Sequence, residues 1–233
     1  MAKQGSGEHG HPLKVMETAI LVDGGFYLKR ARSLFGSMTP KERADELENY
    51  CKKHINKFGD RHLYRVFYYD CPPSGAVIWN PVTQKNVPLA KTNLYSWTKD
   101  FHEELAHRRK FALRMGELLD THGCYTLKKD SLKKLLVGKK TLNDLTDDDL
   151  DLNIRQKGVD MKLGLDIASL AYGGIVNQVI MIAGDSDFVP AAKMARRQGI
   201  DFILDPMWSH ITSSLNLHID GLETCCKKPS QKN

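Results

Sequence analysis

The stretch "QVIMIAGDSDFVPAAKMARRQGIDFILDP" (residues 178–206) decides the fold class of the chain. It begins with an apolar run, continues as a segment with helical spacing that stops at Gly199, and ends with a second apolar run. A strand, a helix and a strand in this order are typical of a parallel α/β unit, in which helices cover the sheet. Pro190 favours the first turn of the helix, because proline has no backbone N–H to donate. We therefore expect the N-cap of this helix at Asp187 or slightly later.

The rest of the chain shows the same alternation of strand and helix patterns. Further strands are expected at 18–23, 62–70, 111–118 and 123–129, and further helices from about Phe26, at 39–58 and at 158–174. The pattern predicts a three-layer α/β sandwich with a central, mainly parallel sheet. The stretch 72–156 fits the alternation less well and is expected to be an insertion. We predict one domain over residues 14–222, with flexible tails at 1–13 and 223–233.

Composition limits the class of protein. The chain has 233 residues, 41% of them hydrophobic and 27% charged, and a net charge of +6, which favours a polyanionic partner only weakly. No apolar run is long enough to cross a membrane, and the polar N-terminus does not resemble a signal peptide. Five irregularly spaced cysteines without a C-x-x-C pair indicate reduced thiols and no zinc site. We therefore expect a cytoplasmic protein with no membrane partner.

Acidic residues follow the predicted strands. Asp23, Asp70 and Asp185 each come directly after an apolar run, and Asp205 follows the last strand. An aspartate at such a place is often only a turn or helix-capping residue. Because the carboxyl ends of parallel strands meet at one edge of the sheet, however, these acids are expected to lie together where ligands bind. Asp187 lies beside Asp185 and is expected to join them.

The helix predicted at 158–174 supplies two more acids. At about 100° per residue, Asp160 lies near the centre of its apolar stripe, and Asp166 lies on the flank. A carboxylate aimed at an apolar face is costly unless it is paired or binds a metal. Asp160 is therefore the stronger candidate for a metal ligand, and Asp166 is a candidate for an outer one.

Clustered carboxylates need a cation. Oxygen ligands with no His or Cys at metal-binding spacing favour Mg²⁺ or Mn²⁺ over zinc. The chemistry natural to such a site is the metal-assisted attack of water on a phosphodiester.

Four motifs together resemble the NYN domain family, PIN-like ribonucleases that include the bacterial LabA-like proteins. The resemblance rests on "LVDGGFYLKRA" (21–31), "YYDCPP" (68–73), "KGVDMKLGLD" (157–166) and "AGDSDFVPAAKMARRQGI" (183–200). It implies a PIN-like α/β sandwich, RNA as the substrate and a divalent metal bound by aspartates. Carried over by position, the catalytic and metal-binding acids are Asp23, Asp160, Asp185 and Asp187, with Asp166 as a further metal ligand.

The sequence differs from many family members at two positions. Phe26 stands where many members have Asn, as in a subgroup with an aromatic residue after "DGG", and Ala183 replaces Ser or Thr. Polar residues near the acids are candidates for RNA contacts: Ser186, Lys157, Lys193 and Arg197.

The leading hypothesis is a Mg²⁺- or Mn²⁺-dependent endoribonuclease. One alternative treats D-S-D as the metal motif of a nucleotide-sugar glycosyltransferase, which leaves Asp23 and Asp160 without a role. The other is a catalytically weak RNA-binding or regulatory protein that keeps the acidic site. The sequence leaves open which RNA is cut, and whether the protein is a homo-oligomer.

Overall fold

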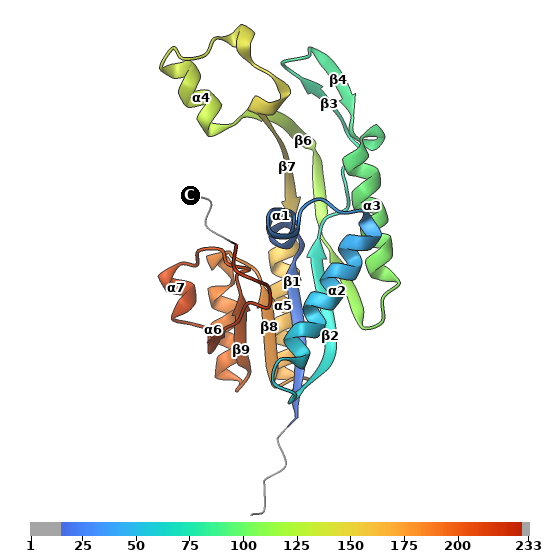
Figure 1. The fold of residues 1–233 in the computed structure, drawn as a ribbon, viewed down its shortest axis with the longest axis vertical. Helices are drawn as coiled ribbons and strands as arrows, with labels where there is room; N and C mark the ends of the chain where they lie inside the picture. The colour runs from blue at the N-terminus through green and yellow to red at the C-terminus, as the bar shows by residue number, and fades with distance from the viewer. Residues whose placement is uncertain (1–14, 230–233) are drawn as a thin grey trace, which may run out of the picture.

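A six-stranded parallel sheet forms the centre of the molecule. The computed structural model describes residues 15–229 (Figure 1). The strand order is β10-β9-β8-β1-β2-β5, and every neighbouring pair is parallel. The strands are β1 (Met16–Asp23), β2 (Arg61–Asp70), β5 (Phe111–Met115), β8 (Gln178–Ile182), β9 (Asp201–Asp205) and β10 (Gly221–Leu222).

Helices cover both faces of the sheet. One face carries α1 (Gly24–Phe35), α2 (Pro40–Asn56) and α3 (Asn93–Ala106), and the other carries α5 (Val159–Tyr172) and α6 (Val189–Arg197). Successive residues of a strand point to opposite faces, so the sheet supplies two separate cores. In β1, Ile20 and Val22 pack under α1–α3, whereas Ala19 and Leu21 pack under α5 and α6. The expected three-layer α/β sandwich is confirmed.

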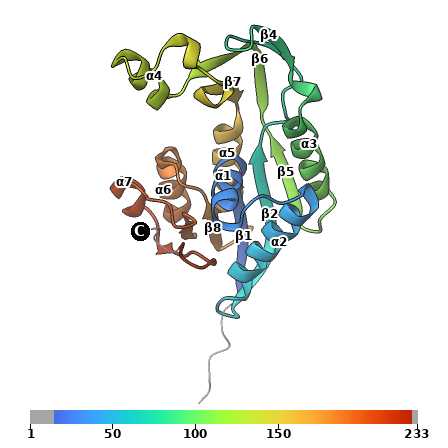
Figure 2. The ribbon, with the colours of Figure 1, turned by 45° about the horizontal axis from the view of Figure 1, so that its top comes forward.

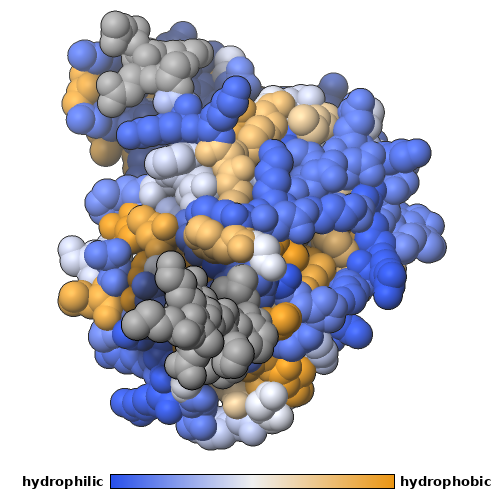
Figure 3. Space-filling model, turned by 60° about the horizontal axis from the view of Figure 1, so that its bottom comes forward, coloured by the Kyte–Doolittle hydropathy of each residue, from blue (hydrophilic) through white to orange (hydrophobic). Residues whose placement is uncertain are grey.

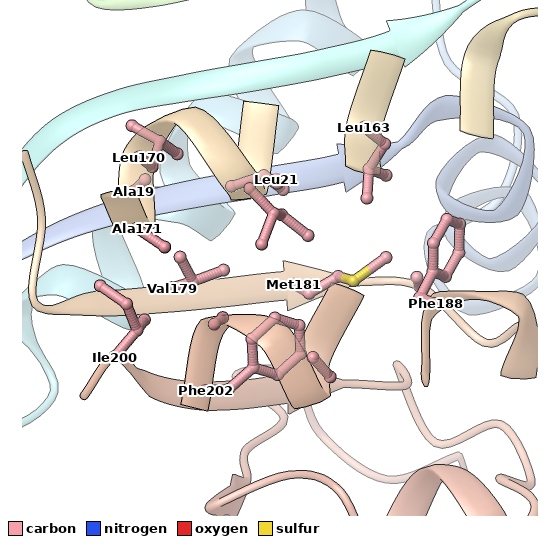
Figure 4. Close-up of a cluster of buried hydrophobic side chains, with 14 of the residues drawn as sticks. Ala19, Leu21, Leu163, Leu170, Ala171, Val179, Met181, Phe188, Ile200 and Phe202 are labelled. Carbon is pink, nitrogen blue, oxygen red and sulfur yellow. The ribbon is translucent and has the colours of Figure 1, made fainter. Parts of the chain in front are cut away.

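The core beneath α5 shows why the sequence pattern predicts a buried helix. Leu163, Ile167, Leu170 and Ala171 are all buried at helical spacing on one side of α5. Figure 4 shows Leu163 on the same side of the core as Met181 and Phe188, and Leu170 at the other end, beside Ala19 and Ala171. Burial of such side chains contributes about 1.5–3 kcal/mol each, which fixes α5 against the sheet.

The region from 72 to 156 contains both core elements and elaborations. Helix α3 buries Phe101 and Leu105 in the core, and β5 pairs with β2 at the edge of the sheet. The elaborations are an antiparallel hairpin and a longer two-stranded arm, which rise beyond the ends of the sheet strands (Figures 1 and 2). They consist of β3 (Val77–Asn80) with β4 (Lys85–Pro88), and β6 (Glu117–Leu127) with β7 (Leu150–Lys157), with α4 (Lys129–Leu136) between β6 and β7.

The strand expected at 111–118 is divided at Gly116. Strand β5 stays in the sheet up to Met115, and β6 leaves it at Glu117 to form the arm. A Cβ atom at Gly116 would lie 2.6 Å from a Val159 methyl and 2.8 Å from the Lys157 carbonyl oxygen. A glycine is therefore required where the arm leaves the sheet so close to the start of α5.

The structure describes most of the predicted C-terminal tail but none of the predicted N-terminal tail. The predicted N-terminal tail at 1–13 lies outside the described residues. At the other end, α7 (Ser213–Asn216) and β10 are followed by residues that contact the core. Glu223 binds Arg61 at 2.7 Å, and the Thr224 hydroxyl donates to Asp205 at 2.9 Å. The core therefore includes the first residues of the stretch that the sequence assigns to a C-terminal tail.

The surface at the amino ends of the strands is mostly hydrophilic, with small separate hydrophobic patches (Figure 3). No helix in residues 15–229 has the length and apolar character needed to span a bilayer.

The start of α2 provides a stability prediction. The Thr39 hydroxyl accepts from the Glu42 N–H at 3.3 Å, and the Glu42 carboxylate accepts from the Thr39 N–H at 2.9 Å. Removing this capping box by Thr39→Ala should cost about 1 kcal/mol of unfolding free energy. Urea denaturation measures it, with Thr83→Ala as a control at an exposed threonine in the β3–β4 turn. An equal loss in both variants would contradict the capping assignment.

Candidate metal-binding site

Three aspartates meet at the carboxyl edge of the sheet. Asp23 ends β1 and Asp70 ends β2, while Asp185 comes three residues after the end of β8. Strand β1 lies between the other two, with Asp23 opposite Tyr69 of β2 and Val22 opposite Ile182 of β8. The register therefore places the three acids at adjacent positions along one edge.

A fourth acid comes from the start of α5. The arm returns along β7 and turns at Gly158, whose φ of 85° favours glycine, and α5 begins at Val159. Asp160 lies in the first turn, and its side chain is exposed. The turn at Gly158 thus brings Asp160 back to the edge that carries Asp23 and Asp185.

The pKa values show that these carboxylates lie within electrostatic reach of one another. Burial is the main cause that raises the pKa of Asp23; the Phe26 N–H lowers it, and the charges of Asp160, Asp70 and Asp185 raise it again. The pKa of Asp160 is raised first by loss of hydration and then by Asp185 and Asp187. Four acids from three separate segments, Asp23, Asp160, Asp185 and Asp187, therefore form one negative cluster, which we call the acid cluster.

The described residues supply no cationic partner to the acid cluster. Asp23 caps α1 by accepting from the Phe26 N–H at 3.1 Å, and Asp185 accepts from the Asp187 N–H at 3.1 Å. Among the side chains that the structure describes, which leave out those of residues 120–122, 155 and 186, no Lys, Arg or His forms an ion pair with any of the four. The same part of the chain holds no three His, Cys, Asp or Glu side chains placed to bind one metal ion together.

Phe26 fixes the loop that carries Asp185. Its ring lies against Gly184, where a Cβ atom would come within 2.4 Å of the ring carbon Cε2. The loop continues as a 3-10 turn, Ser186–Phe188, and α6 begins at Val189 with Phe188 as its N-cap, within the range that Pro190 predicts. The aromatic residue at position 26 thus packs directly against the glycine of the G-D-S-D motif.

This contact gives a second stability prediction. Gly184→Ala should destabilise the protein by about 1 kcal/mol, because the added methyl overpacks the contact with Phe26. Thermal unfolding of the double variant Gly184→Ala/Phe26→Leu should recover part of the loss, since leucine leaves more space. If the stability loss of the double variant equals the sum of the losses in Gly184→Ala and Phe26→Leu, the methyl and the ring do not meet.

Asp166 has partners of its own. Its carboxylate accepts from Arg114 Nε at 2.7 Å and from the Tyr69 hydroxyl at 2.9 Å. It lies six residues after Asp160, about 9 Å along the helix at 1.5 Å per residue. Arg114 already compensates its charge, so Asp166 ties α5 to β5 and β2.

Two further strand-end acids are also held by other groups. Asp70 accepts from the Cys71 N–H at 2.8 Å and the Tyr68 hydroxyl at 3.2 Å, and His102 Nε2 lies 3.1 Å away. Asp205 is completely buried and is bound by His54 at 2.8 Å and Tyr50 at 2.6 Å. Asp205 is therefore a structural residue. Asp70 borders the acid cluster. Its position directly after the apolar run "FYY" is the feature of the sequence that predicts an acid at this edge.

The expected RNA-binding residues lie in different places. Lys157 is exposed at the end of β7, three residues before Asp160. Lys193 and Arg197 line a separate open pocket of about 750 Å³ with Arg196 and His218, and none of the acid cluster borders it. Arg197 ends α6, about 12 Å along the helix axis from Val189 at its start, at 1.5 Å per residue. The side chain of Ser186 lies outside the described part of the structure.

Comparison with known proteins places the chain in a family. One solved structure is similar: a protein of unknown function from Vibrio parahaemolyticus, 14% identical, with a TM-score of 0.46 over 91% of this chain and 94% of the other. No curated protein matches significantly. The family model of the NYN domain matches residues 96–215, more than half of the chain, a range that contains Asp160, Asp185 and Asp187. The chain therefore belongs to the NYN domain family.

Proposed function

We propose that the protein is a metal-dependent endoribonuclease that hydrolyses RNA phosphodiester bonds at the acid cluster. NYN membership implies a PIN-like nuclease fold, and NYN domains are generally ribonucleases. The observation that carries the proposal is the meeting of Asp23, Asp160 and Asp185 from three segments, with no cationic partner in the described residues. Carboxylates gathered in this way repel one another, and a bound cation relieves that repulsion.

The donor set fits Mg²⁺ or Mn²⁺. Mg²⁺ in nucleotide-cleaving sites is commonly held by one or two carboxylates, and water and substrate phosphate supply the other ligands. A pair from the acid cluster is enough for such a site, and three side chains converging on one point are not required. We assign the direct contacts to two of Asp23, Asp160 and Asp185, and we assign contacts through coordinated water to the third and to Asp187. Asp166 is placed in an outer, positioning role because Arg114 already occupies its carboxylate.

The protein groups prepare the site for water attack on phosphorus. Asp23 and Asp185 are held in position by the backbone N–H groups of Phe26 and Asp187. A divalent cation bound there would lower the pKa of a coordinated water and withdraw charge from the scissile phosphate. A carboxylate of the acid cluster would orient the attacking water and accept its proton as the new bond from water oxygen to phosphorus forms; the bond from phosphorus to the leaving oxygen would break, and that oxygen would take a proton from solvent. To Lys157, which is exposed three residues before Asp160, we assign a contact with an adjoining phosphate.

A cleavage assay tests the proposal. The full chain is incubated with a mixed pool of RNAs in EDTA, Mg²⁺ or Mn²⁺, and the products are separated by size. We expect internal cleavage with metal and none in EDTA. If no RNA is cut with either metal while RNA is still bound, the protein is an RNA-binding or regulatory member of the family.

A further inference from the structure

A groove leads away from the acid cluster between α1 and α3. It consists of two adjoining pockets of about 300 and 780 Å³, which share Leu28, Leu94 and Thr98 in their walls. The smaller pocket is bordered by Gly25, two residues after Asp23, and by Asp70. The larger one extends along α1 to the loop between α1 and α2. We call the two together the α1–α3 groove.

One side of α1 forms a wall of this groove. Gly25, Leu28, Lys29 and Arg32 fall within about 100° of the helix circumference, at 100° per residue. The distance from Gly25 to Arg32 is about 10 Å along the axis at 1.5 Å per residue. The wall therefore begins beside the acid cluster and carries two cations at increasing distance from it.

The larger pocket has an uncompensated positive charge. Lys29 and Arg32 are exposed, and neither forms an ion pair with a described residue. Arg43 also lines the pocket, but it is buried and bound to Glu46 at 3.0 Å and to the Gly36 carbonyl at 2.6 Å. No acidic residue lines this pocket. Two free cations without a nearby carboxylate are complementary to phosphate groups.

The groove also holds an immobilised aromatic ring. Trp97 lines the larger pocket, where its Nε1 donates to the Met38 carbonyl at 2.9 Å. Its ring stacks on Phe101, with centroids 5.2 Å apart and planes 20° apart. Leu28 and Leu94 add apolar surface to the same pocket. An aromatic ring fixed among apolar side chains beside free cations is typical of sites that stack the bases of single strands.

We infer that the α1–α3 groove binds a single-stranded stretch of RNA adjoining the phosphate that lies at the acid cluster. The inference rests on the proposed function, because the scissile phosphate sets where the strand enters. Lys29 and Arg32 contact backbone phosphates, and Trp97 with Leu94 contacts the bases. Pockets of this size accept small-molecule-sized ligands, so the groove takes a few unpaired nucleotides and excludes a duplex.

Binding measurements in the Asp185→Asn background test the inference without cleavage. The probe is a short, unstructured, fluorescein-labelled oligoribonucleotide, compared with the same sequence as a blunt duplex. The variant is Lys29→Ala/Arg32→Ala. The matched control is Lys53→Ala/Arg109→Ala, which removes two exposed cations at the amino end of the sheet, in the last turn of α2 and just before β5.

We expect the groove variant to bind the single strand about tenfold more weakly, with a salt slope smaller by about 1.4 for two lost phosphate contacts. The control should change affinity by less than about twofold, and the duplex should not distinguish the two variants. Leu94→Ala, at a side chain that is 68% exposed, should weaken single-strand binding about threefold with an unchanged salt slope.

Several results would overturn the inference. The first is that the protein binds no single strand at all. The second is that the groove variant and the control variant lose the same affinity for the single strand. The third is that the groove variant loses as much affinity for the duplex as for the single strand. A dimer that Leu94→Ala dissociates in light scattering, with RNA binding unaffected, would make the groove an interface between two copies. The proposed function fails separately. If the wild type cuts no RNA but Lys29→Ala/Arg32→Ala still weakens single-strand binding, the groove binds RNA and the protein is not a nuclease.

Discussion

Asp185→Asn is expected to reduce RNA cleavage by at least about a thousandfold, or roughly 4 kcal/mol at 1.36 kcal/mol per factor of ten. An amide holds the cation less tightly than a carboxylate and contributes less to lowering the pKa of a bound water. The fold should be kept, because Asp185 is exposed and its hydrogen bond from the Asp187 N–H can be made by an amide oxygen. Affinity for RNA should persist, since basic side chains supply most of the binding to the phosphate backbone.

The comparison needs variants that separate loss of chemistry from loss of charge. Asp100→Asn removes an exposed carboxylate of α3 outside the acid cluster and should cleave like wild type. Asp166→Asn should cost less than Asp185→Asn, because its main effect is to loosen the contact with Arg114. Melting temperature, RNA affinity and cleavage rate are measured on the same preparations. Cleavage by Asp185→Asn at the wild-type rate would remove this site from the reaction.

Mg²⁺ or Mn²⁺ is expected to raise the melting temperature by roughly 5–10 °C at a metal concentration about 100-fold above the Kd, equivalent to about 2.7 kcal/mol. The cation relieves a repulsion that exists only in the folded state, where Asp23, Asp160 and Asp185 are brought together. Asp160→Asn should lose most of the shift. Its side chain is exposed and forms no ion pair with a described side chain, so the variant should fold normally.

The stabilisation by metal should also depend on pH. The pKa values of Asp23 and Asp160 are raised from 3.8 in the folded protein. Their contribution to the stability of the metal-free protein is fully present below that value and is lost as pH rises through the raised pKa values. Protons compete with the cation for these carboxylates as the pH falls, so the shift in melting temperature should be larger at pH 7 than at about pH 4. A shift of equal size at both pH values would place the metal elsewhere.

The sequence predicts the sheet and its covering helices because their signals are local. Strands such as β8 are uninterrupted apolar runs, and α2 carries its capping box within four residues, Thr39 to Glu42. The departure of the arm from the sheet at Gly116 was not predicted. It depends on how closely Val159 and Lys157, some forty residues later in the chain, approach that glycine.

The candidate site was predictable in part for the same reason. The position of an acid after a strand can be seen in the sequence, whereas its partner cannot. Asp166 is bound by Arg114, 52 residues away, and Asp205 by His54, 151 residues away. Only the folded structure shows that these two acids are bound by other side chains, while Asp23, Asp160 and Asp185 lack a cationic partner among the described residues. The pairing decides which acids are available to bind a metal.

The central claim is that the acid cluster is one divalent-metal site, and anomalous diffraction from crystals grown with Mn²⁺ tests it most directly. We expect an anomalous peak about 2.1–2.2 Å from a carboxylate oxygen of Asp23, Asp160 or Asp185, with waters completing the coordination. The peak should disappear in crystals of Asp185→Asn or Asp160→Asn grown in the same way. A wild-type structure at saturating Mn²⁺ with no peak within about 5 Å of these carboxylates, beyond the reach of direct and water-mediated ligands, would contradict the account.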